Sequence, residues 1–392
     1  MIRRGSLAAV VGVAFLGGCG PSTRNEASTI VRDTLPGGVV RVRGPEGGSW
    51  TDGGNWSLLE EYRLGVVEVD GPELFGEVFA VEMDAAGRLY VLDRMAKEVR
   101  VFDTGGSFVR AMGRDGEGPG EFREPFGLTW DTRGHLWIVD VRLRRYSVFD
   151  ADGQHLREYR RRAGGYSWPW PGRFARDGHL YEASYVGGGN VVVRFNPEAE
   201  LAPVDSFPLA LPEPSRFWDL RDERRLGAVV AIPFAGQVEW VLDHEARLWV
   251  GDGAIYALTH RCLSGDTLLV VERAVSPVAV SSEERQKAIR ELDEYAGHPR
   301  LDLSLIPATK PFFRRLIADS DGNLWVLREG SEHDWFFDVF GSDGVFLGSI
   351  ILPVTPSLYP PPLVRSGRMV VVATDDLGTQ SVVVYRIQRG AG

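Results

Sequence analysis

The sequence predicts an all-β protein: a six-bladed β-propeller of four-stranded antiparallel blades, closed by an N-terminal strand and carrying one inserted amphipathic helix. The first supporting observation is a repeat, because residues 118–153 match residues 71–106 at a constant offset of 47 positions. The second is a short motif, Asp-x-x-Gly-x-Leu-aromatic-Val, which recurs along the chain. The third is a strand that precedes the first repeat, while the last repeat ends one strand early. Repeats of this length that are rich in strand formers are typical of propeller blades.

The short motif explains the local structure of each blade. Its Asp and Gly favour a tight turn, and the residues after them alternate as a half-buried strand. Six copies predict six blades. Their central apolar positions are Leu89, Leu136, Leu180, Leu248, Leu324 and Met369.

The ends of the chain predict how the ring closes. Residues 57–64 precede the first repeat just as residues 107–112 precede the second, so they form an outermost strand with no blade in front of them. The last blade has its third strand near residues 382–387 and lacks a fourth. We therefore expect residues 57–64 to complete the last blade, which makes residues 55–392 one closed domain without open sheet edges.

The second repeat also resembles a known family. The residues are Phe122-x-x-Pro125-x-Gly127-Leu128, Gly134-x-Leu136-Trp137-Ile138-Val139-Asp140 and Tyr146-x-Val148-Phe149-Asp150. This pattern resembles the NHL repeat of six-bladed propellers of the TolB-like kind, and the resemblance extends over roughly residues 57–386. Enzymes of this architecture, those similar to gluconolactonase, hold calcium with acidic residues and an asparagine at the channel mouth.

The N-terminus predicts export. Arg3 and Arg4 precede an apolar stretch at residues 7–15 that is too short to span a bilayer. The following Leu16-Gly17-Gly18-Cys19 resembles the bacterial lipobox. That resemblance implies that residues 1–18 are a signal peptide and that Cys19 carries the lipid; the alternative is an ordinary secretory signal with a chance cysteine. Gly20 is not the Asp that retains lipoproteins in the inner membrane of enteric bacteria, so we expect the outer membrane of the cell envelope.

Composition agrees with this location. Residues 19–54 are polar and rich in Gly and Pro, which predicts a flexible tether. Removing Arg3 and Arg4 with the signal leaves 44 − 2 = 42 basic residues against 54 acidic ones. The resulting acidic surface argues against nucleic acid as a partner and against electrostatic membrane binding, and we expect a monomer. With Cys19 lipidated, Cys262 has no partner for a disulfide, and an inert structural thiol is the favoured reading over a nucleophile.

Two insertions, near residues 203–234 and 276–310, interrupt the spacing of the blades. The second predicts a helix, because Ser281 and Glu284 form a capping box and Ala288, Ile289 and Leu292 share one face. A brace against the propeller is favoured, with a lid over the central channel as the alternative. Topology places both insertions opposite the tight turns, and function on rigid scaffolds usually resides on such variable loops.

Candidate binding residues lie on that face. Trp168 and Trp170 suit stacking on sugar rings, although packing between blades is the plainer reading. His333 and Asp334 belong to a polar loop without metal-ligand spacing. The residues expected to contact a ligand or partner are Trp168, Trp170, Tyr185, Asp252, His333 and Asp334.

The predicted function is binding or scaffolding, with an envelope protein, peptide or polysaccharide as partner and the membrane reached through the N-terminal lipid. No catalytic residue, metal ligand or cofactor is assigned, because no hydrolase or nucleotide-binding motif is present. The alternative is a metal-dependent hydrolase or lyase with calcium at the channel mouth. The inner strands offer Glu82 and Glu239 but also Arg173 and Arg315, so nothing singles out such a site.

Overall fold

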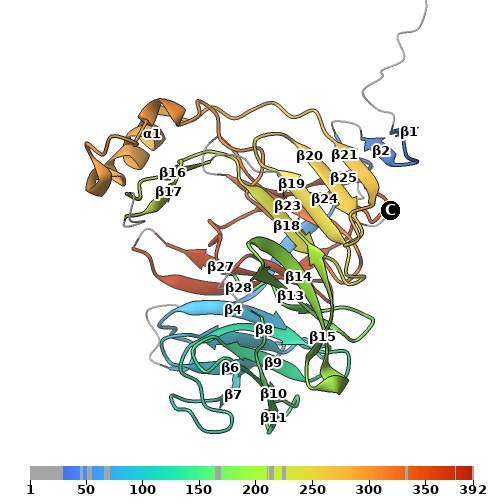
Figure 1. Ribbon diagram of the computed structural model, residues 1–392, viewed down its shortest axis with the longest axis vertical. Helices are drawn as coiled ribbons and strands as arrows, with labels where there is room; N and C mark the ends of the chain where they lie inside the picture. Colours follow the sequence, from blue (N-terminus) through green and yellow to red (C-terminus); the bar gives the residue numbers. More distant parts are fainter. Residues whose placement is uncertain are drawn as a thin grey trace, which may run out of the picture.

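Six antiparallel sheets of four strands form a ring in this computed structural model (Figure 1). The structure describes residues 30–44, 47–50, 55–65, 71–163, 169–209, 211, 216–222, 227–331, 334–375 and 377–390. The six-bladed propeller expected from the repeats is confirmed.

The blades follow the chain in order, each running from its innermost to its outermost strand. Blade 1 contains β4 (Val78–Met83), β5 (Leu89–Asp93), β6 (Glu98–Phe102) and β7 (Phe108–Met112). Blade 2 contains β8 (Pro125–Trp130), β9 (Leu136–Asp140), β10 (Arg145–Phe149) and β11 (His155–Arg160). Blade 3 contains β12 (Arg173–Phe174), β13 (Leu180–Val186), β14 (Gly189–Asn196) and β15 (Ala202–Pro208), with the short helix η2 (Pro197–Ala199) before β15.

The second half of the ring is built in the same way. Blade 4 contains β18 (Val238–Leu242), β19 (Leu248–Asp252), β20 (Ala257–Arg261) and β21 (Thr267–Glu272). Blade 5 contains β22 (Arg315–Ala318), β23 (Leu324–Glu329), β24 (Trp335–Phe340) and β25 (Phe346–Leu352). Blade 6 contains β26 (Leu363–Arg365), β27 (Arg368–Thr374), β28 (Gln380–Gln388) and the N-terminal strand β3 (Ser57–Leu64).

The pairing of β3 with β28 closes the ring, as expected. The register runs from Leu64 opposite Val382 to Ser57 opposite Gln388. One apolar cluster fills each of the six interfaces between neighbouring blades, including the cluster between blade 6 and blade 1. Burial therefore continues around the whole ring, and the closing strand contributes to it because Leu64 lies in the last of these clusters.

The N-terminal segment differs from the expected flexible tether. Strands β1 (Val31–Thr34) and β2 (Val40–Arg43) form a hairpin, and β2 pairs in parallel with β21 at the outer edge of blade 4 (Figure 1). Val42 is fully buried there against the core between blades 4 and 5. The chain then hydrogen-bonds to β25 through Ser49 and Trp50 before entering β3. The described part of this segment is thus built onto blades 4 to 6, because its alternating valines cover an otherwise open sheet edge.

The two insertions pack on each other. The first begins after β15, which is part of blade 3, and contains a hairpin of β16 (Phe217–Asp219) and β17 (Val229–Ala231). The second contains α1 (Ser282–Arg290), η3 (Asp293–Tyr295) and η4 (Leu303–Leu305). We call the described residues of 216–234 and 276–310 the cap. Figure 1 shows α1 beside β16 and β17.

The cap has its own apolar core. The buried residues of this core are Trp218, Leu220, Ile232, Leu292 and Ile306. The predicted capping box of Ser281 and Glu284 is present, but α1 ends at Arg290 and the chain continues as 3-10 turns. The apolar face of this segment therefore covers the β16–β17 hairpin, while Lys310 joins the cap to Glu329 of blade 5. In the described part of the chain, no helix combines the length and apolar character needed to cross a bilayer.

Candidate functional site

The two faces of the ring are built differently. One face, which we call the tight-turn face, carries the turns between first and second strands and between third and fourth strands. Their aspartates cap the main chain: Asp131 Oδ1 accepts from the N–H groups of Arg133 and His135, each at 2.9 Å. The same arrangement follows Asp84, Asp103, Asp150, Asp243 and Asp319. These aspartates are therefore structural.

The opposite face, which we call the loop-rich face, carries the turns between second and third strands, the connections between blades, and the cap. Large apolar side chains stand exposed on it. Tyr185 is 60% exposed and Leu377 is 92% exposed, both beside turns between second and third strands. Other exposed apolar residues of this face are Leu74, Met95, Val186, Phe217, Val229, Ile255, Leu305 and Tyr359. In the turns of the tight-turn face themselves, the described residues include no exposed large apolar side chain, although Phe108, directly after the Asp103 turn, is 39% exposed.

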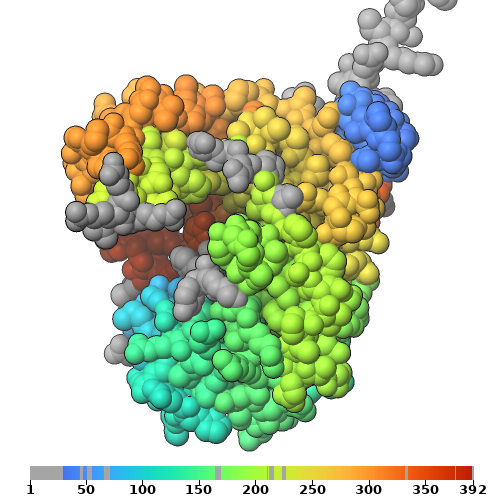
Figure 2. Space-filling model, viewed as in Figure 1, coloured from blue at the N-terminus to red at the C-terminus, as the bar shows by residue number. Residues whose placement is uncertain are grey.

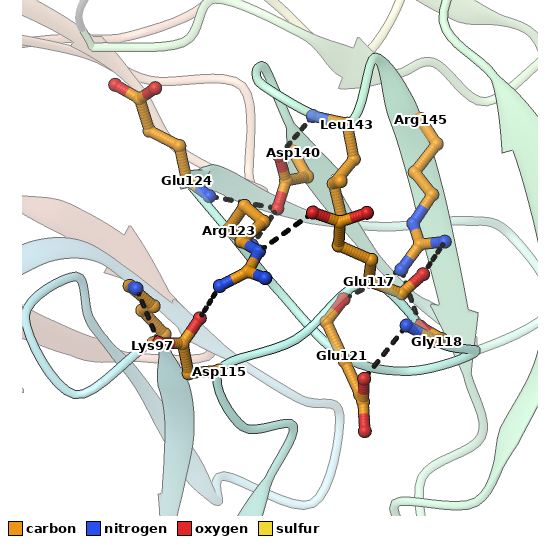
Figure 3. A network of polar contacts seen from close by, with 10 residues as sticks. All are labelled: Lys97, Asp115, Glu117, Gly118, Glu121, Arg123, Glu124, Asp140, Leu143 and Arg145. Carbon is orange, nitrogen blue, oxygen red and sulfur yellow. Dashed lines mark hydrogen bonds and ion pairs between the residues drawn. The ribbon is translucent and has the colours of Figure 1, made fainter.

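A polar network fixes the loop-rich face between blades 1 and 2 (Figure 3). Buried Asp140 accepts hydrogen bonds from the main-chain N–H groups of Arg123 at 2.7 Å, Glu124 at 3.0 Å and Leu143 at 2.8 Å. The Arg123 side chain reaches Asp115 at 2.9 Å. Asp93 of blade 1 plays the same part as Asp140 toward residues 76 and 77. These loops are thus held in place before any partner arrives.

The central channel contains a cavity of about 450 Å³. Its walls are the inner strands β4, β8, β12, β18, β22 and β26, joined by residues 169–172 and 359–362 of the loop-rich face. Every lining residue outside the inner strands belongs to these two loops. The cavity therefore opens toward the loop-rich face. Figure 2 shows the surface hollowed between the orange cap and the green and cyan blades.

Two ion pairs in the channel link neighbouring blades. Glu82 of β4 lies 3.2 Å from Arg365 of β26, and Glu239 of β18 pairs with Arg315 of β22. Burial raises the pKa of both Glu82 and Glu239, although the arginines oppose this effect. The guanidinium of Arg315 also stacks over the ring of Tyr359, with Cζ 4.0 Å from the ring centroid. Each carboxylate of the channel is thus already engaged by an arginine.

Arg173 occupies the end of the channel nearest the tight-turn face. Its guanidinium extends from blade 3 to the main-chain oxygen of Leu242 in blade 4 and, at 3.5 Å, to that of Ala318 in blade 5. Both oxygens belong to the last residues of inner strands, so the side chain extends over the ends of β18 and β22. Burial lowers the pKa of Arg173 more strongly than the attraction of nearby carboxylates raises it.

Trp170 is the sequence candidate that lines the channel. Its indole Nε1–H donates to Oε1 of buried Glu182 at 2.8 Å, and Glu182 is held in turn by Arg161 and Tyr146. A Cβ atom at Gly127 would lie 2.6 Å from the indole ring, so only glycine permits this approach. The ring is therefore a fixed part of the channel wall.

The other sequence candidates do not converge on the channel. Asp252 ends β19 at the position equivalent to Asp93 and Asp140; it accepts from Ala254 N–H at 2.8 Å and pairs with Arg216 of the cap. This role could have been read from the motif, because residues 248–252 repeat the pattern of residues 136–140. Tyr185 and Asp334 stand exposed on the loop-rich face.

Trp168, His333 and Cys19 lie outside the described residues. Cys262 lies half-buried in the turn between β20 and β21, one residue beyond the end of β20. Sequence reasoning noticed Arg173 only as a mark against a calcium site. The sequence feature that could have identified Arg173 is an arginine at an inner-strand position where the other blades carry apolar residues, a glutamate or a threonine.

A second cavity, of about 390 Å³, lies between blades 2 and 3 on the tight-turn face. Its polar lining is already engaged, because Asp131 bonds the Trp137 indole at 3.0 Å and His135 at 3.0 Å. Across the part of the chain that the structure describes, no three His, Cys, Asp or Glu side chains are grouped so that they could hold a metal ion.

Comparisons with known proteins agree on the architecture. Residues 72–162 match the model of the family DUF5128, described as a 6-bladed beta-propeller. No curated protein matches the chain. Because the family match covers less than half of the 392 residues, it supports the fold and assigns no activity.

Solved structures with similarity include a protein of Bacteroides fragilis described as exported, with 13% identity, TM-score 0.48 and coverage of 86% of this chain and 95% of that one. A member of the DUF4221 family from Bacteroides vulgatus has 12% identity, TM-score 0.45 and coverage of 86% and 99%. Virginiamycin B lyase from Staphylococcus aureus has 10% identity, TM-score 0.42 and coverage of 85% and 99%. These likenesses are too distant to carry an argument about function.

Proposed function

We propose that this protein is a lipid-anchored, NHL-type propeller of the bacterial cell envelope, held at the outer membrane through Cys19, that binds an envelope protein through its loop-rich face. The observation that supports this proposal is the distribution of exposed apolar side chains. Tyr185 stands near the end of β13, and Ile255 and Leu377 stand in turns between second and third strands, so the three residues come from three different blades of the loop-rich face. Exposed apolar side chains that gather on one face of a protein favour an interaction surface there more than a single exposed side chain does.

Rigidity of the face supports the same role. Asp93 and Asp140 hold the loops between blades 1 and 2, and Lys310 fixes the cap to blade 5. A binding surface that is already ordered loses little conformational entropy when a partner docks. A protein is favoured over a polysaccharide, because these side chains are scattered over a broad surface and aromatic hot spots suit a protein interface.

Site-specific photo-crosslinking in cells tests this proposal. A photoreactive amino acid would replace Tyr185 or Ile255 on the loop-rich face, with Asp152 and Arg133 on the tight-turn face as matched exposed controls. We expect adducts of discrete mass from positions 185 and 255 that protease digestion removes. Equal adducts from both faces, or none from either, contradict the proposal, and a protease-resistant adduct would indicate a polysaccharide instead.

The alternative enzyme is not proposed for this chain. Glu82 and Glu239, the carboxylates that line the channel, are each paired with an arginine. A calcium ion prefers six or more oxygen ligands, and arginine competes with it for these oxygens.

A further inference from the structure

We infer that the channel is a blind pocket that binds a small organic acid, with the carboxylate on Arg173 at the floor and a flat ring between the aromatic walls above it. This inference goes beyond partner binding, because the site lies inside the ring and its ligand is a small molecule. It stands on the position of Arg173, the shape of the cavity and the character of its walls.

Arg173 has unused capacity to bind an anion. A guanidinium offers five N–H donors, and two of those of Arg173 are used, both by main-chain oxygens of Leu242 and Ala318. Among the described residues, no carboxylate lies within ion-pair distance of it. An arginine that is partly exposed to the channel and not paired with a carboxylate can form a charge-assisted hydrogen bond with an anionic ligand.

Comparison with other enclosed arginines supports this reading. Although burial lowers the pKa of Arg161, its pairing with Glu182 raises it overall. The pKa of Arg173 is lowered, because burial outweighs the more distant attraction of Glu82 and Asp243. Arg315 and Arg365 are each engaged by a channel glutamate. Arg173 is thus the channel arginine that lacks an anion.

Contacts between blades span the floor of the channel, the end nearest the tight-turn face. The Arg173 guanidinium bridges blades 3, 4 and 5, and the pair of Glu82 with Arg365 joins blades 1 and 6. The volume of about 450 Å³ is within the range of small-molecule pockets, about 300 to 1,000 Å³. A ligand would therefore enter from the loop-rich face and reach Arg173 with its leading end.

The upper walls favour a flat, apolar ligand body. Trp170, Trp240 and Tyr359 line the cavity together with Phe126 and prolines 360–362. Trp170 is held by Glu182, and Tyr359 is stacked on Arg315. Rings fixed in this way present apolar faces at little entropic cost, and they favour an aromatic ring or another flat ring over a flexible chain.

The charge of the pocket selects the sign of the ligand. Arg173 and Arg315 line the pocket with Glu82 and Glu239, and Arg365, which is not part of the lining, pairs with Glu82. Glu239 pairs with Arg315, so Arg173 is the one charge of this group that is left without a partner of opposite sign. His244, beside the floor, adds none near neutral pH, because burial lowers its pKa to about 4. An anion is therefore preferred over a cation or a neutral molecule of the same shape.

The test uses two probes of nearly equal shape on the folded, full-length protein. Calorimetry would compare 1-naphthaleneacetate, which carries the carboxylate, with neutral 1-naphthaleneacetamide. We expect the acid to bind at least about tenfold more tightly, as a charge-assisted hydrogen bond to Arg173 implies. Inorganic phosphate and galacturonate serve as further probes: tighter binding of phosphate, or of the sugar acid, than of the aromatic acid would overturn the assignment of a flat-ring ligand.

Variants locate the site. Arg173→Gln should weaken binding of the acid at least about tenfold and leave the amide unchanged, whereas Arg176→Gln, an exposed arginine paired with Glu245, should change neither. Tyr185→Ser should weaken partner crosslinking and leave the acid bound, which separates this site from the proposed partner face. Equal affinity for acid and amide in the unaltered protein, or no binding of either at millimolar concentration, overturns the inference even if Arg173→Gln fails to fold.

Discussion

The Nζ atom of Lys310 lies 2.8 Å from Oε1 of Glu329, fully buried, where the cap meets the end of β23 in blade 5. The same ammonium lies 2.6 Å from Oε1 of Glu284 in α1 and 3.0 Å from the main-chain oxygen of Gly330. Burial lowers the pKa of Lys310, but the two carboxylates raise it overall. One lysine therefore ties the first turn of α1 to the propeller.

We expect Lys310→Met to lower the free energy of unfolding by about 3 kcal/mol, because it leaves the carboxylates of Glu284 and Glu329 facing each other with only Arg314, 3.7 Å from Glu329, as a nearby cation. Urea unfolding would measure the change. Lys287→Met, an exposed lysine of the same helix, is the control and should change stability by less than about 0.5 kcal/mol. Similar unfolding curves for the two variants would show that the cap is not held by Lys310.

The N-terminal hairpin offers a matched pair of valines on one strand. Val42 is fully buried against the core between blades 4 and 5, whereas Val40 is 38% exposed. Val42→Ala should cost about 2 kcal/mol in unfolding free energy, and Val40→Ala should be nearly neutral. If both substitutions are equally tolerated, β2 does not stay on the edge of blade 4 in solution.

Stability should fall in mild acid because of His244. Burial, reinforced by the guanidinium groups of Arg173 and Arg365, lowers the pKa of His244 to about 4 from 6.5. Between these values the unfolded chain binds a proton that the folded protein does not, so the contribution of His244 is complete above pH 6.5 and is lost as pH falls toward 4.

We expect His244→Gln to reduce the loss of stability between pH 7.5 and pH 5. Urea midpoints of both proteins at the two pH values measure this difference. An identical loss in the variant would assign the acid sensitivity to other groups.

The anchoring proposal rests on Cys19, which supplies the only thiol expected to carry lipid. Cys19→Ser should abolish incorporation of labelled palmitate and leave the precursor uncleaved, because the thiol is the acceptor of the diacylglycerol. Cys262→Ser is the control and should label normally. Palmitate in the Cys19→Ser protein would refute lipid anchoring at this position.

Much of the fold followed from the sequence because the information is repeated and local. Each Asp-x-x-Gly segment forms its own turn, as Asp84 and Asp319 do, and the alternating residues after it can only form a strand. Counting these segments gave six blades. The strand left over before the first blade and the strand missing from the last gave the pairing of β3 with β28.

The candidate site was only partly predictable. The sequence identified Trp170 because a tryptophan in a loop of the expected face suits stacking on a ligand ring. The structure places Trp170 in the channel wall. Asp252 was expected to contact a ligand, but its carboxylate accepts a hydrogen bond from a main-chain N–H group of the adjacent loop. Asp140, at the equivalent position of blade 2, also binds main-chain N–H groups. The sequence showed that Arg173 lies on an inner strand but not what it contacts. The main-chain oxygens that it contacts belong to blades 4 and 5, about 70 and 145 residues further along the chain.

The sequence by itself determined the blades, their order and their closure, since these depend on short-range turn chemistry and on a repeated hydrophobic pattern. Only the tertiary structure decided where the segments without repeats pack: β2 on β21, the two insertions on each other, and the guanidinium of Arg173 across the channel. Each of these contacts joins surfaces that have no counterpart elsewhere in the chain. Their pairing is set by which exposed edge, apolar face or carbonyl group the completed ring brings within reach, and that geometry does not exist until the ring has formed.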